Sequence, residues 1–265
     1  MSISVLMCEP KYFDIEYEIN PWMSKGNQVD THLAQVQWHR LYQIYTQQLG
    51  WRVKLLEPQP HIPDLVFTAN GGLVIDGKAA LPTFRHPVRQ PETVADEAWF
   101  KANDYTEILK PSNDFEGEGD ALVWNDTIFG GYPWRSDQRS HQEIGEFFGK
   151  KVISLQLADA RFYHLDTCLT IVDSETVALW PKAFTAEALK LVHDTVPNVI
   201  EASDKDALVY GLNAMSDSKN IVIPEGANGL IKIYKDRGMN VFPTPISEFQ
   251  KSGGGVKCLT LELRD

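Results

Sequence analysis

Cysteines and long apolar runs are scarce in this sequence of 265 residues. The three cysteines, Cys8, Cys168 and Cys258, have no CxxC spacing, so they indicate neither a disulfide framework nor a zinc knuckle. No apolar run reaches the roughly 18 residues that a membrane span needs, and the N-terminus lacks the pattern of a signal peptide. We therefore expect free thiols, no membrane partner and a cytoplasmic protein.

Positive charge is scarce as well, because 25 Lys and Arg residues stand against 36 Asp and Glu residues. The formal net charge of -11 repels a phosphate backbone and no basic cluster interrupts it, so nucleic acid is excluded as a partner. A hydrophobic content of 43% is enough to bury an ordinary globular core. The oligomeric state stays open, and a homo-oligomer is compatible with the sequence.

Turn-rich segments followed by β-rich runs recur along the chain, as in "FTANGGLVIDGKAALP" and "FEGEGDALVWNDTIFGGYP". Helical patterns lie between them, for example over residues 31–49 and 185–193. The expected order is strand, strand and helix, repeated. The apolar face expected for the first helix consists of Leu33, Val36, Trp38, Leu41 and Ile44.

Polar residues in these segments fall at regular intervals. Asn70, Glu116 and His164 are separated by 46 and 48 residues, and Cys258 follows His164 by 94, or twice 47. Such a period predicts an array of about five units in which equivalent strand ends converge. The fifth unit falls around "NAMSDSKN", and residues 1–50 supply the strand and helix that close the ring.

A second interval supports the first, since Arg89 follows Asn70 and Arg135 follows Glu116 by 19 residues each. The competing interpretation is a two-layer α/β domain whose polar residues recur by chance.

Several carboxylates and a histidine are candidates for chemistry. If "FEGEGD" is extended, Glu116, Glu118 and Asp120 line one face, because alternate residues of a strand point to the same side. The same rule places His164 and Asp166 together in "FYHLDTCLT". A solvated turn, a loose cation site and a satisfied core histidine are the competing interpretations.

Three glycines stand shortly before Cys258 in "SGGGVKCLT". They remove side-chain bulk where a ligand would approach, which a merely buried thiol does not need. We interpret Cys258 as a nucleophile, and Cys8 and Cys168 as packing residues.

A cysteine beside an imidazole forms a nucleophile and acid/base pair, and surrounding carboxylates favour a cationic substrate. A guanidinium presents only donors, so Glu116 and Asp166 on either side of its plane would hold it. A zinc site of His, Cys and Glu ligands is the competing chemistry, but the ligands lack the usual short pairings, and no metal is expected.

The motifs "FTAN", "FEGEGD", "FYHLDTCL" and "GGGVKCLTLEL", with "EPKYFDIEYEINPWM" near the start, together resemble the pentein superfamily of guanidino-group-modifying enzymes. The resemblance covers essentially the whole chain. It implies a single catalytic domain over residues 1–265, folded as a five-bladed, pseudo-fivefold α/β propeller of ββαβ repeats. It also implies a reaction without a metal or organic cofactor.

The resemblance implies roles for individual residues. Cys258 matches the nucleophile, His164 the acid/base and Glu116 the carboxylate of the triad. The choice between Glu116 and Glu118 stays open. Deiminases usually read "EGGD", in which Glu lies three residues before Asp, whereas Glu116 lies four and Glu118 two residues before Asp120. We favour Glu116, which relatives reading "FEGAGD" keep. The residues that match substrate-binding positions are Asp166 for the guanidinium, Arg89 and Arg135 for the substrate carboxylate, and Asn20 for the amino-acid end. Asn70, Glu118 and Asp120 are further candidates for substrate binding. A turn before Pro21 is the competing role for Asn20.

Deiminases carry Asp where this chain has Asn70. Together with "INPWM" and "FEGEGD", this resembles the arginine dihydrolase branch, which takes L-arginine to ornithine, ammonia and carbon dioxide. The alternatives are an arginine deiminase or a dimethylarginine dimethylaminohydrolase, and in minor place an amidinotransferase or a non-catalytic pentein that binds through its surface.

Overall fold

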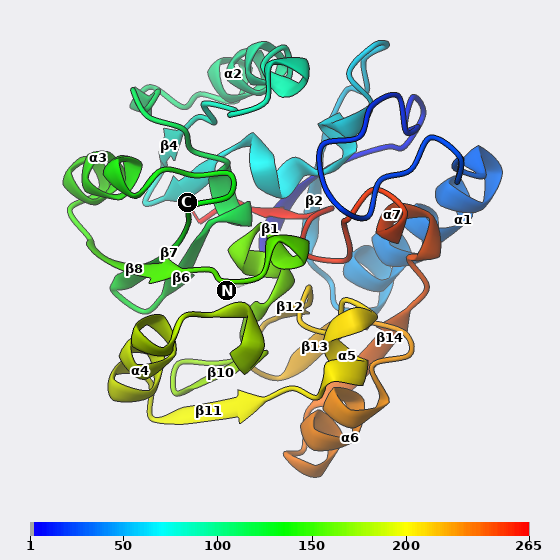
Figure 1. Ribbon diagram of the computed structural model, residues 1–265. Coiled ribbons are helices and arrows are strands. Elements are labelled where there is room, and N and C mark those ends of the chain that lie inside the picture. Colours follow the sequence, from blue (N-terminus) through cyan, green and yellow to red (C-terminus); the bar gives the residue numbers. More distant parts are fainter. Residues whose placement is uncertain (1–2, 265) are drawn as a thin grey trace.

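The strands of the part of the chain that the structure describes form five small sheets. The computed structural model describes residues 3–264, so Met1 and Asp265, the ends of the predicted single domain, lie outside it. Each sheet has three strands, and the sheets surround the middle of the molecule (Figure 1). In every sheet the central strand pairs antiparallel with one neighbour and parallel with the other. The predicted α/β class is confirmed.

The strands follow the predicted order of strand, strand, helix and strand. The first sheet consists of β15 (Leu261–Glu262), β1 (Ser4–Cys8) and β2 (Arg52–Leu56). The others, in chain order, are β3 (Leu73–Ile75), β4 (Lys78–Ala80) and β5 (Ile108–Leu109); β6 (Ala121–Trp124), β7 (Thr127–Tyr132) and β8 (Lys151–Gln156); β9 (Leu169–Ile171), β10 (Thr176–Leu179) and β11 (Asn198–Glu201); and β12 (Met215–Ser216), β13 (Asn220–Pro224) and β14 (Asn240–Thr244).

A helix joins the two parallel strands of each sheet, because parallel neighbours need a crossover connection. The crossover helices are α1 (Thr31–Gln43), α2 (Glu92–Ala102), α3 (Gln138–Phe148), α4 (Ala186–Thr195) and α6 (Asn228–Asp236). Two shorter helices, α5 (Asp204–Leu208) and α7 (Ser247–Gln250), lie outside the crossovers. None of the helices within residues 3–264 is long and apolar enough to cross a membrane.

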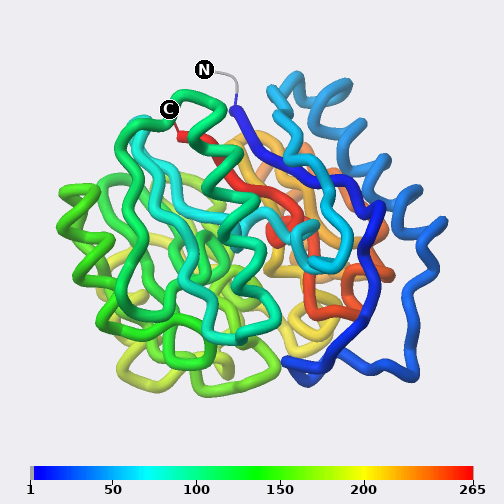
Figure 2. The backbone as a smooth tube through the Cα atoms, turned by 90° about the horizontal axis from the view of Figure 1, so that it is seen from above, coloured from blue at the N-terminus to red at the C-terminus, as the bar shows by residue number. Residues whose placement is uncertain are grey.

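The two ends of the chain meet in the first sheet. Strand β15 pairs antiparallel with β1, with Val5 opposite Glu262 and Leu6 opposite Leu261. Figure 2 shows the N-terminal and C-terminal segments, blue and red, running side by side. The strand and helix predicted within residues 1–50 are therefore β1 and α1, and the sheet they begin is completed only by β15.

The predicted apolar face of α1 is partly wrong. Leu33 and Val36 are 38% and 51% exposed, whereas Ala34 and Gln37 are buried. Buried Gln37 is satisfied because its amide donates to Ser247 Oγ at 2.8 Å, so a polar residue takes a place that the pattern reserved for an apolar one. The helix continues into a π-helical turn over Ile44–Gln48. The residues of the predicted face that are buried are Trp38, Leu41 and Ile44.

All three thiols are free, as predicted. Cys8 and Cys168 are at most 1% exposed and pack within separate apolar clusters. Both cysteines occupy the packing positions expected for them.

Because β15 completes the first sheet and Leu261 on it is fully buried, we expect substitution of Leu261 to lower the free energy of unfolding strongly. Leu261→Ala should lower the free energy of unfolding by about 2–5 kcal/mol, because it removes buried methyl groups and leaves a cavity. Leu33→Ala, the same change at the exposed face of α1, should alter it by no more than about 0.5 kcal/mol. Urea unfolding of both variants measures this, and equal effects would contradict the assignment of the two faces.

Candidate active site

Seven predicted site residues, Asn70, Glu116, Glu118, Asp120, His164, Asp166 and Cys258, lie on four turns that each precede the first strand of a three-stranded unit. A fifth turn of the same kind precedes β12 and carries Asn213, whereas Asn20, Arg89 and Arg135 lie outside these turns. Hydrogen bonds join every turn to the next. The links are Glu118 N to Gly72 O at 2.9 Å, Leu165 N to Asp120 Oδ1 at 3.1 Å, Asn213 Nδ2 to Asp166 O at 3.0 Å, Lys257 N to Asn213 O at 3.2 Å and Ala69 N to Cys258 O at 3.1 Å. Residues 70, 116, 164 and 258 are thus brought together by a closed circuit of bonds.

His164 and Glu116 form a buried pair. His164 Nε2 lies 2.7 Å from Glu116 Oε2, and Arg135 Nη1 donates to the same oxygen at 3.1 Å. Burial lowers the pKa of His164 to about 4. Burial alone would raise the pKa of Glu116, but Arg135 and His164 outweigh it and hold that pKa below its usual value. At neutral pH the imidazole is neutral, donates through Nε2 and keeps Nδ1 as the nitrogen that can accept a proton.

Cys258 lies against Asp166 and an asparagine. Its Sγ is 3.3 Å from Asp166 Oδ2 and 3.1 Å from Asn213 Nδ2, and the residue is 3% exposed. Burial and the Asp166 carboxylate raise the pKa of the thiol well above its usual value. Burial also raises the pKa of Asp166 to about 7. Cys258 is therefore a thiol at neutral pH before a cation binds, in agreement with a nucleophile that ionises only beside a positive charge.

Asn213 is a site residue that the sequence interpretation missed. It is fully buried, donates to Cys258 Sγ, and accepts from Cys258 N at 3.0 Å through Oδ1. It lies 47 residues after Asp166 and is the first residue of "NAMSDSKN". The spacing that located the fifth unit could therefore have identified it.

The glycines before Cys258 allow close approach of other protein groups rather than of a substrate. A Cβ at Gly253 would lie 2.5 Å from Tyr163 Oη, and one at Gly255 would lie 2.7 Å from Asn213 Oδ1. At Gly254 it would collide with the ring of Phe67. The prediction that they clear space for a substrate is wrong, because protein groups that hold the site fill these positions.

The predicted common face of the "FEGEGD" carboxylates is also wrong. Residues Gly117–Gly119 form a 3-10 turn rather than a strand, so alternate side chains do not point to the same side. The turn sends the three carboxylates to different partners. These are His164 for Glu116, Lys257 at 2.6 Å for Glu118, and Ser136 Oγ at 2.6 Å for Asp120. Likewise, Asp166 lies within the 3-10 turn Leu165–Thr167, which His164 directly precedes, and neither residue is on a strand.

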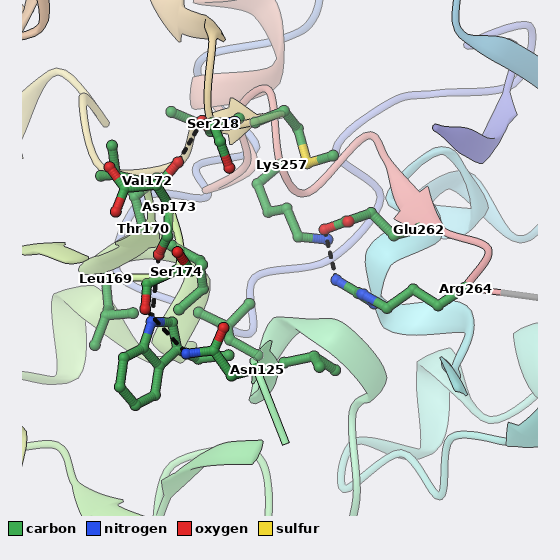
Figure 3. Close-up of a pocket in the computed structure, with 17 residues that line it drawn as sticks. Asn125, Leu169, Thr170, Val172, Asp173, Ser174, Ser218, Lys257, Glu262 and Arg264 are labelled. Atoms are coloured by element: carbon green, nitrogen blue, oxygen red, sulfur yellow. Dashed lines mark hydrogen bonds and ion pairs between the residues drawn. The ribbon is translucent and has the colours of Figure 1, made fainter. Parts of the chain in front are cut away.

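A cavity of about 240 Å³ lies beside Lys257. Strands β6, β9, β12 and β15 contribute to its lining, and Figure 3 shows Lys257, Glu262 and Arg264 next to one another there. Neither Cys258 nor His164 lines this cavity. Lys257 thus lines this cavity, whereas the next residue, Cys258, lies at the candidate active site.

Asn70 has its amide orientation fixed. Arg89 Nη1 donates to Asn70 Oδ1 at 3.0 Å, and Asn70 Nδ2 donates to Glu116 O at 3.2 Å. Arg89 itself is buried and forms two 2.7 Å bonds to Glu92, with Asp64 at 3.7 Å. The acidic side chains already bind this guanidinium. The predicted contact of Arg89 with a substrate carboxylate stays a prediction.

Asn20 and Arg135 are joined through Tyr163. The Arg135 guanidinium lies 4.5 Å from the centre of the Tyr163 ring. Asn20 Nδ2 donates to Tyr163 Oη at 3.2 Å, and its Oδ1 accepts from Trp22 N at 2.9 Å. Asn20 therefore stabilises its own turn and also attaches the "INPWM" segment to the site.

Comparison with known proteins gives consistent relatives. Residues 9–265 match the family of N,N dimethylarginine dimethylhydrolase, eukaryotic. A dimethylarginine dimethylaminohydrolase of Mycobacterium tuberculosis is 40% identical over 97% of this chain and 84% of that protein. The bifunctional arginine dihydrolase/ornithine cyclodeaminase AgrE of Nostoc sp. is 36% identical over 99% of this chain, which spans 38% of that protein.

Among solved structures, the product-bound N-terminal domain of ArgZ, an arginine dihydrolase from the ornithine-ammonia cycle in cyanobacteria, matches with a TM-score of 0.94. The match has 36% identity and covers 99% of this chain and 98% of that one.

The environment of Cys258 predicts its titration. Ultraviolet absorbance of the free protein should show no Cys258 thiolate at neutral pH, because burial and Asp166 disfavour the anion. Asp166→Asn should lower the thiol pKa by roughly 1 to 3 units, since it removes the neighbouring negative charge. A thiolate step well below neutral pH that is absent in Cys258→Ser would contradict this environment.

Proposed function

The chain belongs to the N,N dimethylarginine dimethylhydrolase family within the pentein superfamily, and we propose that it converts L-arginine to ornithine, ammonia and carbon dioxide. It is a hydrolase that acts on guanidino carbon–nitrogen bonds. The observation that carries the proposal is the Asn70 amide, held beside Glu116 where deiminases carry a carboxylate.

We propose further that the five units form one catalytic domain, a pseudo-fivefold propeller of ββαβ repeats. Five similar three-stranded sheets and the bonds between successive turns support this. The cytoplasmic location and a homo-oligomer stay predictions.

The first half-reaction begins when the guanidinium binds between Glu116 and Asp166. The positive charge lowers the pKa of Cys258, and Sγ attacks the guanidinium carbon. The thiol proton passes through His164 to the departing nitrogen, so ammonia leaves and a covalent thiouronium cation remains. Water then adds to that carbon and gives up a proton to His164, and departure of the thiolate yields citrulline.

The second half-reaction repeats the attack on the ureido carbon. Cys258 expels a second ammonia and forms a carbamoyl thioester, which water cleaves to a carbamate. The carbamate decomposes to ornithine and carbon dioxide. The ureido group is neutral and has a carbonyl acceptor, to which the Asn70 amide can donate; an Asp at position 70 would repel it. Asn70 therefore accommodates both the guanidinium and the ureido intermediate.

Product stoichiometry tests the proposed reaction. Purified protein incubated with L-arginine and no added metal should release two ammonia per ornithine, with little citrulline. One ammonia per citrulline would make it a deiminase and remove our account of Asn70.

Dimethylarginine hydrolysis is the second candidate, favoured by the matched family and the Mycobacterium tuberculosis relative. Release of dimethylamine from N,N-dimethylarginine, assayed in parallel, measures it. We expect at least a roughly tenfold preference for L-arginine in kcat/KM, because Cys258, His164 and Asp166 are at most 3% exposed and two methyl groups on one nitrogen need additional room. The reverse preference would replace the first candidate by the second.

Asn70→Asp should stop the reaction at citrulline, because the carboxylate repels the ureido oxygen. Product ratios over time measure the change, with Asn125→Asp in the β6–β7 turn as a control that should keep the wild-type ratio. Continued ornithine formation by Asn70→Asp would refute this role of the amide.

A further inference from the structure

Tyr210 completes the series of site residues. It lies 46 residues after His164 and 48 before Cys258, the same two intervals that separate Asn70, Glu116 and His164. The structure supports this equivalence, because Asn213 N donates to Tyr210 O at 2.9 Å as Thr167 N donates to His164 O at 3.2 Å. Tyr210 thus opens its turn as His164 opens the turn of the preceding unit.

The hydroxyl of Tyr210 is buried without a protein partner. The residue is 0% exposed, and no side chain or backbone group among residues 3–264 hydrogen-bonds to Oη. Such groups are rare because an unpaired buried hydroxyl is costly. The backbone has a φ of 59°, in the left-handed region that a tyrosine seldom adopts, and such strain is concentrated at functional sites.

The surroundings of Tyr210 place it at the site. Its ring packs against Trp22 of the "INPWM" segment, with centroids 4.8 Å apart. Three residues later, Asn213 contacts Cys258 Sγ. Burial raises the pKa of Tyr210 above its usual value, and interactions with Tyr163, Cys258 and Asp166 raise it further. Asp166 Oδ1 also lacks a partner within residues 3–264.

We propose that Tyr210 is a further substrate-binding residue, whose neutral hydroxyl accepts from the guanidinium in the first half-reaction and donates to the ureido oxygen in the second. The inference rests on the proposed function. A phenol can do both because it carries one donor and acceptor lone pairs, whereas Asp166 and Glu116 only accept when ionised. The contact would also satisfy the buried hydroxyl only when substrate is present.

Tyr210→Phe removes this one oxygen, and Tyr234→Phe is a matched control. Tyr234 is also 0% exposed with an unpartnered hydroxyl among the described residues, but it lies on α6 in an apolar cluster. Both variants should keep or raise the melting temperature, because each deletes an unsatisfied buried group. Only Tyr210→Phe should lose kcat/KM for L-arginine, by roughly 3- to 10-fold, and it should also accumulate citrulline.

Equal kcat/KM and product ratios in Tyr210→Phe, Tyr234→Phe and wild type would overturn the assignment. The three proteins are assayed with L-arginine and with N,N-dimethylarginine. If wild type consumes only dimethylarginine, the proposed function fails, whereas the rate of Tyr210→Phe relative to Tyr234→Phe on that substrate still decides whether Tyr210 contacts the reacting group.

Discussion

Each of the five turns at the site is hydrogen-bonded to the next, and the bond from Ala69 N to Cys258 O returns the last turn to the first. Because every turn has two neighbours, its position is fixed from both sides, and a shift of one turn would strain all the others. This constraint fixes the positions of His164 and Cys258 although neither lies on a helix or strand. The small sheets hold the turns at the correct spacing, and the glycines before Cys258 let the neighbouring turns approach closely.

Buried charge at the site is nearly all compensated within the protein. Glu116 is paired with Arg135, Glu118 with Lys257, and these ion pairs are almost inaccessible to solvent. Buried ions persist only when they are paired and hydrogen-bonded. Asp166 differs, because its Oδ1 accepts no hydrogen bond from any residue that the structure describes. A cationic planar substrate would supply the missing charge and donors, which is consistent with a guanidine.

Spacing predicted more of this molecule than residue alternation did. The intervals between Asn70, Glu116, His164 and Cys258 located the units, because each unit has nearly the same length. Alternation failed at "FEGEGD", since a 3-10 turn of three residues has no pattern that distinguishes it from a strand end. Asn213 was missed because it carries no charge, and its importance comes from contacts with residues 47 positions earlier and 45 later. The face of α1 was misjudged for a related reason: a long-range hydrogen bond makes a polar residue suitable for burial.

Pairing of β15 with β1 has a consequence for synthesis on the ribosome. Four of the five sheets are made of strands encoded within a continuous stretch of the chain, so each can form as its own segment emerges. The first sheet cannot, because β1 is translated before the other described strands and must wait for β15, which begins three residues after Cys258. The circuit of turns closes through Cys258 O, so a nascent chain cannot assemble the turns around Cys258 until the segment that carries β15 has left the ribosome.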